Sequence, residues 1–474
     1  MRFLFCGYLL FLTWAAATVM NPADPDLWHR LAVGEFLWQT GHFPHGDVFS
    51  YLSDYKNVAD HEWGSALIFY GLWQWGGGAA IVATKLMTLA VTLALVIWAG
   101  VRNRRPTAWM AAFYALVLLA LLPSFQSTVR CMVFTHIFFA LWVCWFQRER
   151  QGRPVPSFLY VLTMIVWANL HGGFVIGLAW LLVVSVLEGI DHGAWKKWVV
   201  RFGLCALATL INPFGGQLWI STGRALLITR SGFGEWAPVS WLSDPKNYFG
   251  YKLLFISVVV ALAIQIYRKG WKQIDRPGAI LIGVFMLLAM TSARHTSLFA
   301  VVAGALLPGI FPLKWPYDLR RRPLRRLVAV GVNFGIVIVP FFMALIVLPQ
   351  GAGLRLEYPR VACPVGAVDF LEHQDIRGKL LVPFNYGSYA LWELRGKMRV
   401  SMDGRYDLVY RPETYRRVDD FFSARPGWYN LLTTPAPDAV LVPRSTDVYF
   451  KLRSDPGWKD AWHDSVNAVF LPRQ

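Results

Sequence analysis

The sequence predicts an α-helical polytopic membrane protein that carries a small α/β domain at its C-terminal end. Of its 474 residues, 55% are hydrophobic and 16% are charged, whereas soluble domains contain about 25% charged residues. Apolar segments long enough to cross a bilayer recur along most of the chain. From about Leu354 onward, the apolar runs shorten and charged residues become more frequent. We therefore expect a transmembrane domain at 1–350 and an outer domain at 351–474.

The formal net charge of +17 does not indicate nucleic-acid binding in such a protein. Membrane proteins gather Lys and Arg in their cytoplasmic loops, and this rule alone explains a basic balance. The five cysteines lie far apart and show no metal-ligand spacing. We therefore expect neither a disulfide framework nor a cysteine metal cluster. These cysteines are Cys6, Cys131, Cys144, Cys205 and Cys363.

About eleven segments are candidate transmembrane spans. Residues 2–20 follow Arg2 and show no clear signal-peptide cleavage site, so we expect an uncleaved span with the N-terminus in the cytoplasm. The others are near the length that a bilayer requires if some are tilted or short. They are residues 79–100, 107–123, 131–147, 157–170, 173–189, 198–211, 250–267, 277–293, 296–313 and 327–348.

Basic residues in alternate connections indicate the orientation of these spans. All five basic loops are cytoplasmic if the apolar segment Glu62–Trp75 does not cross the bilayer, and the residues after the last span are then outside. If Glu62–Trp75 does cross, every later loop changes side. We prefer the first arrangement. The basic loops hold Arg102, Arg104 and Arg105; Arg148, Arg150 and Arg153; Lys196, Lys197 and Arg201; Arg268, Lys269, Lys272 and Arg276; and Lys314, Arg320, Arg321, Arg322, Arg325 and Arg326.

The first outer loop, residues 21–62, is the first long polar segment and is rich in acidic residues and histidines. Within it, Leu27–Trp38 has the pattern of a short amphipathic juxtamembrane helix. Asp26 stands where the N-cap of this helix belongs, because its carboxylate can accept hydrogen bonds from free N–H groups of the first turn. The stretch from Gly41 to Lys56 is assigned only as loop.

The preferred orientation places many ionisable residues on the outer face. Carboxylates and cations that share one face suit a site that binds an anion and transfers a proton. Each residue also has a structural explanation, such as helix capping for a carboxylate or headgroup contacts for an arginine. Those explanations do not select one face, so the cluster supports the functional interpretation. Its members are Asp24, Asp26, His29, His61, Glu62, Arg130, His171, Glu235, Arg294 and His295.

The last residues read as a small α/β domain of about 120 residues, a common domain size. Helices are expected at Val368–Glu372 and Glu413–Phe422. The segment Asp403-Gly404-Arg405-Tyr406-Asp407 follows the second expected strand and is either a ligand contact or a turn with an internal ion pair. Short apolar runs predict buried strands. These runs are Leu380–Phe384, Met398–Met402, Ala439–Pro443 and Ala468–Leu471.

Short motifs recur along nearly the whole chain, and together they resemble those of the GT-C superfamily of polytopic glycosyltransferases, which includes protein mannosyltransferases and the lipid A aminoarabinose transferase. The closer resemblance is to a set of bacterial GT-C-like membrane proteins. One departure is the single Trp before His29. The motifs are Asp24-Pro25-Asp26-Leu27-Trp28-His29, His61-Glu62-Trp63, Leu170-His171-Gly172-Gly173, Asn212-Pro213-Phe214-Gly215, Glu235-Trp236-Ala237-Pro238, Ser292-Ala293-Arg294-His295 and Asp403-Gly404-Arg405-Tyr406-Asp407.

The resemblance implies a transferase of the bacterial inner membrane with its active site on the periplasmic face. Its donor would be a sugar on a polyprenyl phosphate, and its acceptor a lipid, glycan or protein of the cell envelope. Such chemistry requires a base that takes the acceptor proton and cations that hold the leaving phosphate.

The resemblance also implies roles for individual residues. The base is Asp26 or Asp24, with Glu62 as the alternative. Guanidinium groups bind phosphate oxygens in a bidentate manner, so the phosphate ligands would be Arg130, Arg294 and His295. Other outer residues would orient the sugar or the acceptor: His29, His61, His171 and Glu235. A divalent metal, Mg²⁺ or Mn²⁺, on Asp24 and Asp26 is a further option, although the sequence shows no third ligand.

Two other classes of function are compatible with charges at the mouth of a helix bundle. A transporter or flippase for a lipid-linked sugar would carry charges near the middle of its spans and an inverted repeat, and the sequence shows few such charges and no repeat. A non-catalytic scaffold of envelope polysaccharide assembly would tolerate single replacements of the outer acids and arginines. Sugar transfer by purified protein in detergent, where no gradient exists, separates an enzyme from a transporter.

Overall fold

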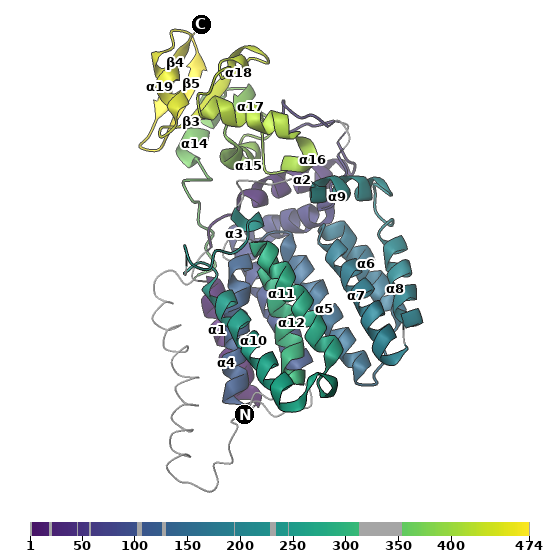
Figure 1. Ribbon diagram of the computed structural model, residues 1–474. Helices are drawn as coiled ribbons and strands as arrows, with labels where there is room; N and C mark the ends of the chain where they lie inside the picture. The colour runs from purple at the N-terminus through teal and green to yellow at the C-terminus, as the bar shows by residue number, and fades with distance from the viewer. Residues whose placement is uncertain are drawn as a thin grey trace, which may run out of the picture. The chain divides into compact units, whose positions relative to one another are not determined.

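The computed structural model describes residues 2–473, apart from 19–20, 45, 56–57, 102–106, 126–128, 194, 228–233, 245 and 312–352. The described chain is mostly helical and contains one small sheet (Figure 1). The expected span at 327–348 and the basic loops at 102–105 and 314–326 lie outside the described residues.

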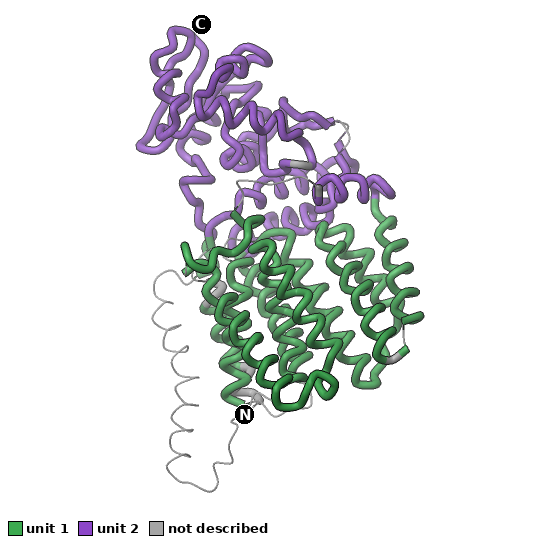
Figure 2. The backbone as a smooth tube through the Cα atoms, viewed as in Figure 1, with its two compact units in different colours: residues 1–21, 82–212, 229–355 green, residues 22–81, 213–228, 356–474 purple. Residues whose placement is uncertain are grey.

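The chain forms two compact units, and neither is continuous in sequence (Figure 2). Unit 1 comprises residues 1–21, 82–212 and 229–355. Unit 2 comprises residues 22–81, 213–228 and 356–474. The expected domains at 1–350 and 351–474 stay a prediction. Unit 2 nevertheless combines the C-terminal residues with the first outer loop, which the chain order alone does not suggest.

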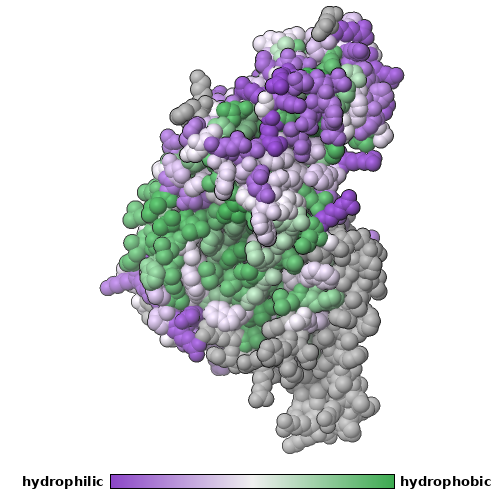
Figure 3. All heavy atoms as spheres, turned by 180° about the vertical axis from the view of Figure 1, so that it is seen from behind, coloured by the Kyte–Doolittle hydropathy of each residue, from purple (hydrophilic) through white to green (hydrophobic). Residues whose placement is uncertain are grey.

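Unit 1 is a bundle of apolar helices, whose side chains cover the face of this unit seen in Figure 3. Every expected span within the described residues falls on a helix. Long aromatic and aliphatic side chains fill the interior, including Trp142, Trp167 and Trp180. The helices are α1 (Arg2–Thr18), the second part of α3 (Trp63–Val101), α4 (Ala108–Leu121), α5 (Met132–Arg150), α6 (Ser157–Leu170), α7 (Phe174–His192), α8 (Trp195–Ala208), α10 (Phe249–Lys269), α11 (Arg276–Thr291) and α12 (Thr296–Ile310).

Among the described residues, five helical segments are both long and apolar enough to cross a membrane. The chain is therefore a membrane protein, while the count of about eleven spans and the orientation stay predictions. Two further apolar helices, α6 and α11, are shorter. The five segments are Trp63–Val101, Ala108–Phe125, Phe174–Asp191, Phe249–Lys269 and Ala293–Ile310.

Helix α3 is interrupted at Gly76 and Gly77, whose backbone angles are not helical. Gly77 has φ 54°, a left-handed conformation that glycine adopts without steric cost. The segment Trp63–Trp75 is therefore separate from the apolar helix that follows. Within unit 2 it packs on α2 (Pro25–Thr40), where Tyr70 donates a hydrogen bond to Glu35. Such a break is what the non-crossing arrangement of Glu62–Trp75 requires.

Helix α2 begins at Pro25, and its N-cap is Asp24. The Asp24 carboxylate accepts a hydrogen bond from the Asp26 N–H at 3.0 Å. Proline is favoured in the first turn because its missing N–H would have no helical partner there. The prediction that Asp26 is the N-cap was therefore wrong. Asp26 lies one turn before His29, so the two side chains share a face of the helix.

The C-terminal residues form a five-stranded sheet in the order β2-β1-β3-β5-β4. Strand β1 pairs in parallel with β2 and β3, whereas β5 is antiparallel to β3 and β4. Four strands were expected, and β4, with its polar sequence, was not. The strands are β1 (Gly378–Leu381), β2 (Met398–Val400), β3 (Ala439–Pro443), β4 (Trp458–His463) and β5 (Asn467–Pro472).

Helices surround this sheet and cover an apolar core that includes Leu381, Val440 and Phe470. The expected strand Leu380–Phe384 ends at Leu381, and its last residue begins α15 instead. The remaining helices of unit 2 are α9 (Gln217–Leu227), α14 (Val365–His373), α15 (Phe384–Glu393), α16 (Tyr406–Val409), α17 (Pro412–Phe422), α18 (Asn430–Thr433) and α19 (Asp447–Ser454).

The first outer loop is part of the C-terminal fold. Ser50 forms a parallel bridge with Val400 at the end of β2, and the Asp54 N–H donates to the Val409 carbonyl at 3.0 Å. Leu52 and Val58 pack against the core of the domain. The stretch that the sequence assigned only as loop therefore acts as an added edge of the α/β domain.

Close packing of α2 on the Trp63–Trp75 helix depends on Gly34. A Cβ at Gly34 would lie 2.7 Å from both the Ala66 carbonyl carbon and Tyr70 Cβ. We expect Gly34→Ala to lower the free energy of unfolding by about 1–3 kcal/mol, as overpacking does, measured as a lower unfolding temperature in detergent. Gly71→Ala is the matched control, because nothing lies within 4 Å of its added Cβ. Equal unfolding temperatures for the two variants would contradict this packing.

Candidate functional site

The first and last motifs of the chain meet within unit 2. Gly404 lies against α2 so closely that an added Cβ would be 2.8 Å from His29 Nδ1 and 2.9 Å from Asp26 Oδ1. His29 is 1% exposed, while Asp26 is half-buried. Asp24 is buried at 5% exposure and caps the helix. Asp26 and His29 are therefore the members of the first motif that lie beside the Asp403-Gly404-Arg405 loop.

His29 is a neutral histidine with one nitrogen in contact with the domain. Its Nδ1 lies 3.3 Å from the Ser388 hydroxyl. Its Nε2 has no hydrogen-bond partner among the described residues. Burial, reinforced by the Arg30 guanidinium, lowers the pKa of His29 to about 4. His29 is therefore suited to a hydrogen bond with a neutral ligand group rather than to ion pairing.

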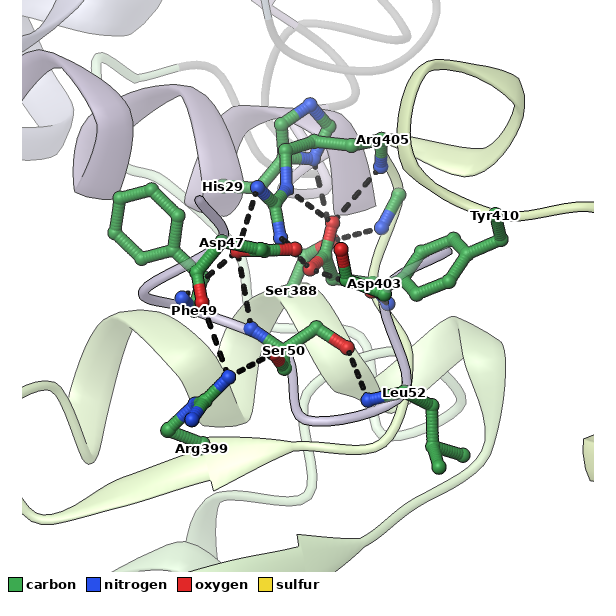
Figure 4. A network of polar contacts seen from close by, with 12 residues as sticks. His29, Asp47, Phe49, Ser50, Leu52, Ser388, Arg399, Asp403, Arg405 and Tyr410 are labelled. Carbon is green, nitrogen blue, oxygen red and sulfur yellow. Dashed lines mark hydrogen bonds and ion pairs between the residues drawn. The ribbon is translucent and has the colours of Figure 1, made fainter. Parts of the chain in front are cut away.

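A buried ion-pair network supports this arrangement (Figure 4). The Arg405 guanidinium donates to both oxygens of Asp47, at 3.1 and 3.0 Å, and to Asp403 at 2.8 and 2.6 Å. The Tyr410 hydroxyl donates to Asp403 at 3.0 Å. Burial opposes the ionisation of Asp403, but Arg405 lowers the pKa of its carboxyl below the ordinary value. The Asp-Gly-Arg segment is thus a turn with an internal ion pair.

A second buried arginine, Arg30, contacts the C-terminal end of the first outer loop. Arg30 contacts Asp60 at 2.5 Å and Glu62 at 2.9 Å. Burial opposes the ionisation of Asp60, yet Arg30 and His61 lower its pKa. His61 Nε2 lies 3.9 Å from Glu62. Glu62, the alternative base, is therefore engaged by a guanidinium.

Three of the predicted residues meet in unit 1. The Arg130 guanidinium donates to Glu235 at 2.6 Å, and Arg294 lies 3.8 Å from the other Glu235 oxygen. Arg294 also lies over the Trp236 ring at 4.3 Å. The Ser292 hydroxyl donates to the Glu235 carbonyl at 3.0 Å and so holds the short helix η2 (Gly234–Trp236) beside η4 (Ala293–His295). Two cations thus share one carboxylate.

The remaining predicted histidines have local partners. His171 Nδ1 lies 2.7 Å from the Thr135 hydroxyl and accepts the Gly173 N–H at 3.0 Å. His295 Nδ1 lies 3.3 Å from the Leu288 carbonyl. These contacts are those of packed helix ends.

Several polar residues of these clusters were not predicted from the sequence. Arg30 follows His29 directly, and Asp60 precedes the His61-Glu62 motif, so position next to a motif was the available signal. Lys85 is 1% exposed and donates to Asn21 at 3.1 Å. A single lysine inside an apolar run is a signal in its own right, because buried charges in such helices are rare.

No group of three His, Cys, Asp or Glu side chains gathers as a metal-ligand set in the described part of the chain. A metal on Asp24 and Asp26 would need further ligands, and Asp24 already serves as a helix cap. The divalent metal on Asp24 and Asp26 stays a prediction.

The low pKa of His29 predicts a pH dependence of stability. As pH falls from 6.5 toward 4, the unfolded chain takes up a proton that folded His29 does not. The folded state therefore loses up to about 3 kcal/mol of stability over this range. We expect His29→Gln to reduce the fall in unfolding temperature between pH 7 and pH 4.5. His463→Gln, which changes an exposed histidine, is the control and should retain the wild-type fall.

No protein-family model and no curated protein sequence matches the chain. Solved structures of two GT-C glycosyltransferases do. The arabinofuranosyltransferase AftD from Mycobacteria is 14% identical with a TM-score of 0.53, and the match covers 99% of this chain and 39% of AftD. ArnT from Cupriavidus metallidurans is 13% identical with a TM-score of 0.56, over 99% of this chain and 97% of ArnT, both without ligand and bound to undecaprenyl phosphate. The chain therefore has the fold of the GT-C glycosyltransferases.

Proposed function

We propose that the protein is a membrane glycosyltransferase that moves a sugar from a polyprenyl-phosphate-linked donor to an acceptor at the periplasmic face of the bacterial inner membrane. The observation that carries the proposal is the Asp26 carboxylate, half-buried beside neutral His29 in a chain with a GT-C fold. ArnT, which has been solved with undecaprenyl phosphate, supports this class of donor.

Asp26 is the best of the three candidate bases. Asp24 is buried and accepts the Asp26 N–H as a helix cap. Glu62 lies 2.9 Å from Arg30, so its carboxylate is already paired with a guanidinium. In the proposed reaction, Asp26 takes the proton of an acceptor hydroxyl or amine. The acceptor atom then bonds to the anomeric carbon with inversion, while the bond from that carbon to the phosphate oxygen breaks and leaves polyprenyl phosphate.

Arg130 and Arg294 are the proposed ligands of the leaving phosphate. With Glu235 they carry one net positive charge, and their side chains are 26% and 23% exposed. Arginine binds phosphate through two parallel hydrogen bonds. His295 stays a prediction in this role, because its Nδ1 faces the Leu288 carbonyl.

The residues proposed to orient sugar or acceptor are His29, His61, His171 and Glu235. His29 is the best supported, because its buried Nε2 has no hydrogen-bond partner among the described residues. Within a dry site, such a nitrogen fits a sugar or acceptor hydroxyl. A divalent metal takes no part in the proposed steps.

Replacement of Asp26 tests the proposed base. We expect Asp26→Asn to fold and to lower the transfer rate by about 10²–10⁴-fold, the usual contribution of a positioned base. The assay follows radiolabelled sugar released from a panel of undecaprenyl-phosphate-linked pentoses and hexoses by purified protein in detergent. Asp24→Asn is the matched control, because asparagine caps helices as well as aspartate does. Full activity of Asp26→Asn would exclude this assignment.

Replacement of the unit 1 arginines tests the phosphate site. We expect Arg130→Gln and Arg294→Gln each to weaken the binding of undecaprenyl phosphate by about tenfold or more, because a charge-assisted hydrogen bond is lost. Native mass spectrometry with undecaprenyl phosphate measures the affinity. Arg377→Gln, which changes an arginine that is 63% exposed, is the control.

Glu235→Gln sharpens the same test. The Glu235 carboxylate is the anion that these arginines contact. If lipid phosphate binds there, removing that charge should tighten the binding of undecaprenyl phosphate, in contrast to the arginine variants. Weaker binding in all three variants would indicate that the cluster is structural.

A further inference from the structure

The loop Asp403-Gly404-Arg405 and helix α15 form the surroundings of Asp26 and His29. Ser388 on α15 lies 3.3 Å from His29 Nδ1, and its hydroxyl accepts the Gly404 N–H at 2.9 Å. Next to it, a Cβ at Gly387 would lie 2.8 Å from the Met402 carbonyl carbon. The loop, α15 and α2 are therefore in direct contact through residues without a bulky side chain.

We propose that Gly404 and Ser388 are positioning residues of the transfer site, so that the C-terminal α/β domain sets where Asp26 and His29 point. This inference rests on the proposed function, in which Asp26 is the base. It assigns to the domain a part in catalysis that neither the motifs nor the fold assigns.

Glycine is required at position 404 because α2 lies so close to it, and not because of its backbone conformation. Its φ lies outside the left-handed region, so an alanine would meet no backbone strain there. The added Cβ would instead press on His29 Nδ1 and Asp26 Oδ1, both within 3 Å. The Asp26 carboxylate is the end of a short side chain and can move aside. Gly404→Ala therefore displaces the proposed base without removing any functional group.

In the proposed arrangement, Ser388 sets which His29 nitrogen carries the proton. Its oxygen accepts the Gly404 N–H, and its own proton can be donated to His29 Nδ1. In neutral His29 of that tautomer, the ring proton resides on Nε2, the nitrogen without a partner among the described residues. A hydrogen bond to one ring nitrogen fixes the role of the other in this way. His29 is thereby prepared to donate to a substrate oxygen.

The ion-pair network makes the loop a rigid support. Asp403 is fully buried and Arg405 is 6% exposed. Arg405 binds the Asp403 carboxylate within the loop and the Asp47 carboxylate of the first outer loop (Figure 4). Functional groups are held best when the residues behind them are themselves fixed by packing and hydrogen bonds. The network thus transmits the geometry of the α/β domain to α2.

The first experiment compares Gly404→Ala with Gly366→Ala in the full chain. At Gly366 an added Cβ meets the Trp462 ring at 3.0 Å, so the two variants impose similar local crowding. We expect Gly404→Ala to lower kcat by about 10- to 100-fold, as small misplacements of reacting groups do, with an unchanged KM for the lipid donor. Gly366→Ala should retain wild-type kcat. Equal kcat values for both variants would overturn the proposal.

The second experiment is a double-mutant cycle with Ser388→Ala and His29→Ala. We expect Ser388→Ala to lower kcat by about tenfold in the wild type and by less than about twofold in His29→Ala, because it acts through His29. Ser388→Thr keeps the hydroxyl and should restore most of the activity. Tyr386→Phe removes another buried hydroxyl of α15, which donates to Asn467 at 2.9 Å, and should retain activity. Equal losses in both backgrounds would show a merely structural role.

A readout without catalysis separates this inference from the proposed function. Deuterium exchange at the C2 position of histidine, followed by mass spectrometry, reports the environment of His29 in each variant. We expect exchange several-fold faster than wild type in Ser388→Ala and Gly404→Ala, and wild-type exchange in Tyr386→Phe and Gly366→Ala. Unchanged exchange in all four would refute the positioning role even if the protein transfers sugar. If Ser388→Ala and Gly404→Ala exchange faster than wild type but the wild-type protein transfers no sugar, only the proposed function is refuted.

Discussion

The interaction on which unit 2 depends is the buried Arg405 guanidinium between Asp47 and Asp403. A charge removed from water is tolerated only when its partners are equally buried and well oriented, and loss of one partner costs about 3–5 kcal/mol. Asp47 belongs to the first outer loop, whereas Asp403 and Arg405 belong to the C-terminal domain. The pairing of Arg405 with Asp47 therefore links two residues that are 358 positions apart in the sequence. The register of the loop, its contact with β2 and the position of Gly404 all follow from it.

The acidic residues near α2 also differ in their partners, because buried charges must be paired. Asp60 and Glu62 lie against Arg30, and Asp24 caps α2. Asp26 instead lies half-buried beside a neutral histidine and the backbone of Gly404. In unit 1 the pairing of Arg130 and Arg294 with Glu235 is partly exposed. Exposed ion pairs contribute little free energy, so an anionic ligand can compete with Glu235 there.

Sequence patterns predicted the elements with long periodic or apolar signals. Each described candidate span falls on a helix, and four strands of the sheet were anticipated from short apolar runs. The misses have local causes. Pro25 starts α2 and makes Asp24 the cap instead of Asp26. The polar strand β4 pairs through its backbone with β5, and Phe384 joins α15 because the strand before it ends at Leu381.

The sequence alone determined that the chain is apolar and helical, that its motifs resemble those of GT-C proteins, and that Asp24, Asp26 and His29 belong to one acidic and histidine-rich segment. It also singled out Arg130, Glu235 and Arg294, which meet in unit 1. Only the tertiary structure decided that Asp24 caps while Asp26 faces Gly404, and that Asp47 and Ser388 belong beside them. Those relations depend on contacts between segments that are hundreds of residues apart. Local periodicity carries no information about which distant side chains will form a buried ion pair.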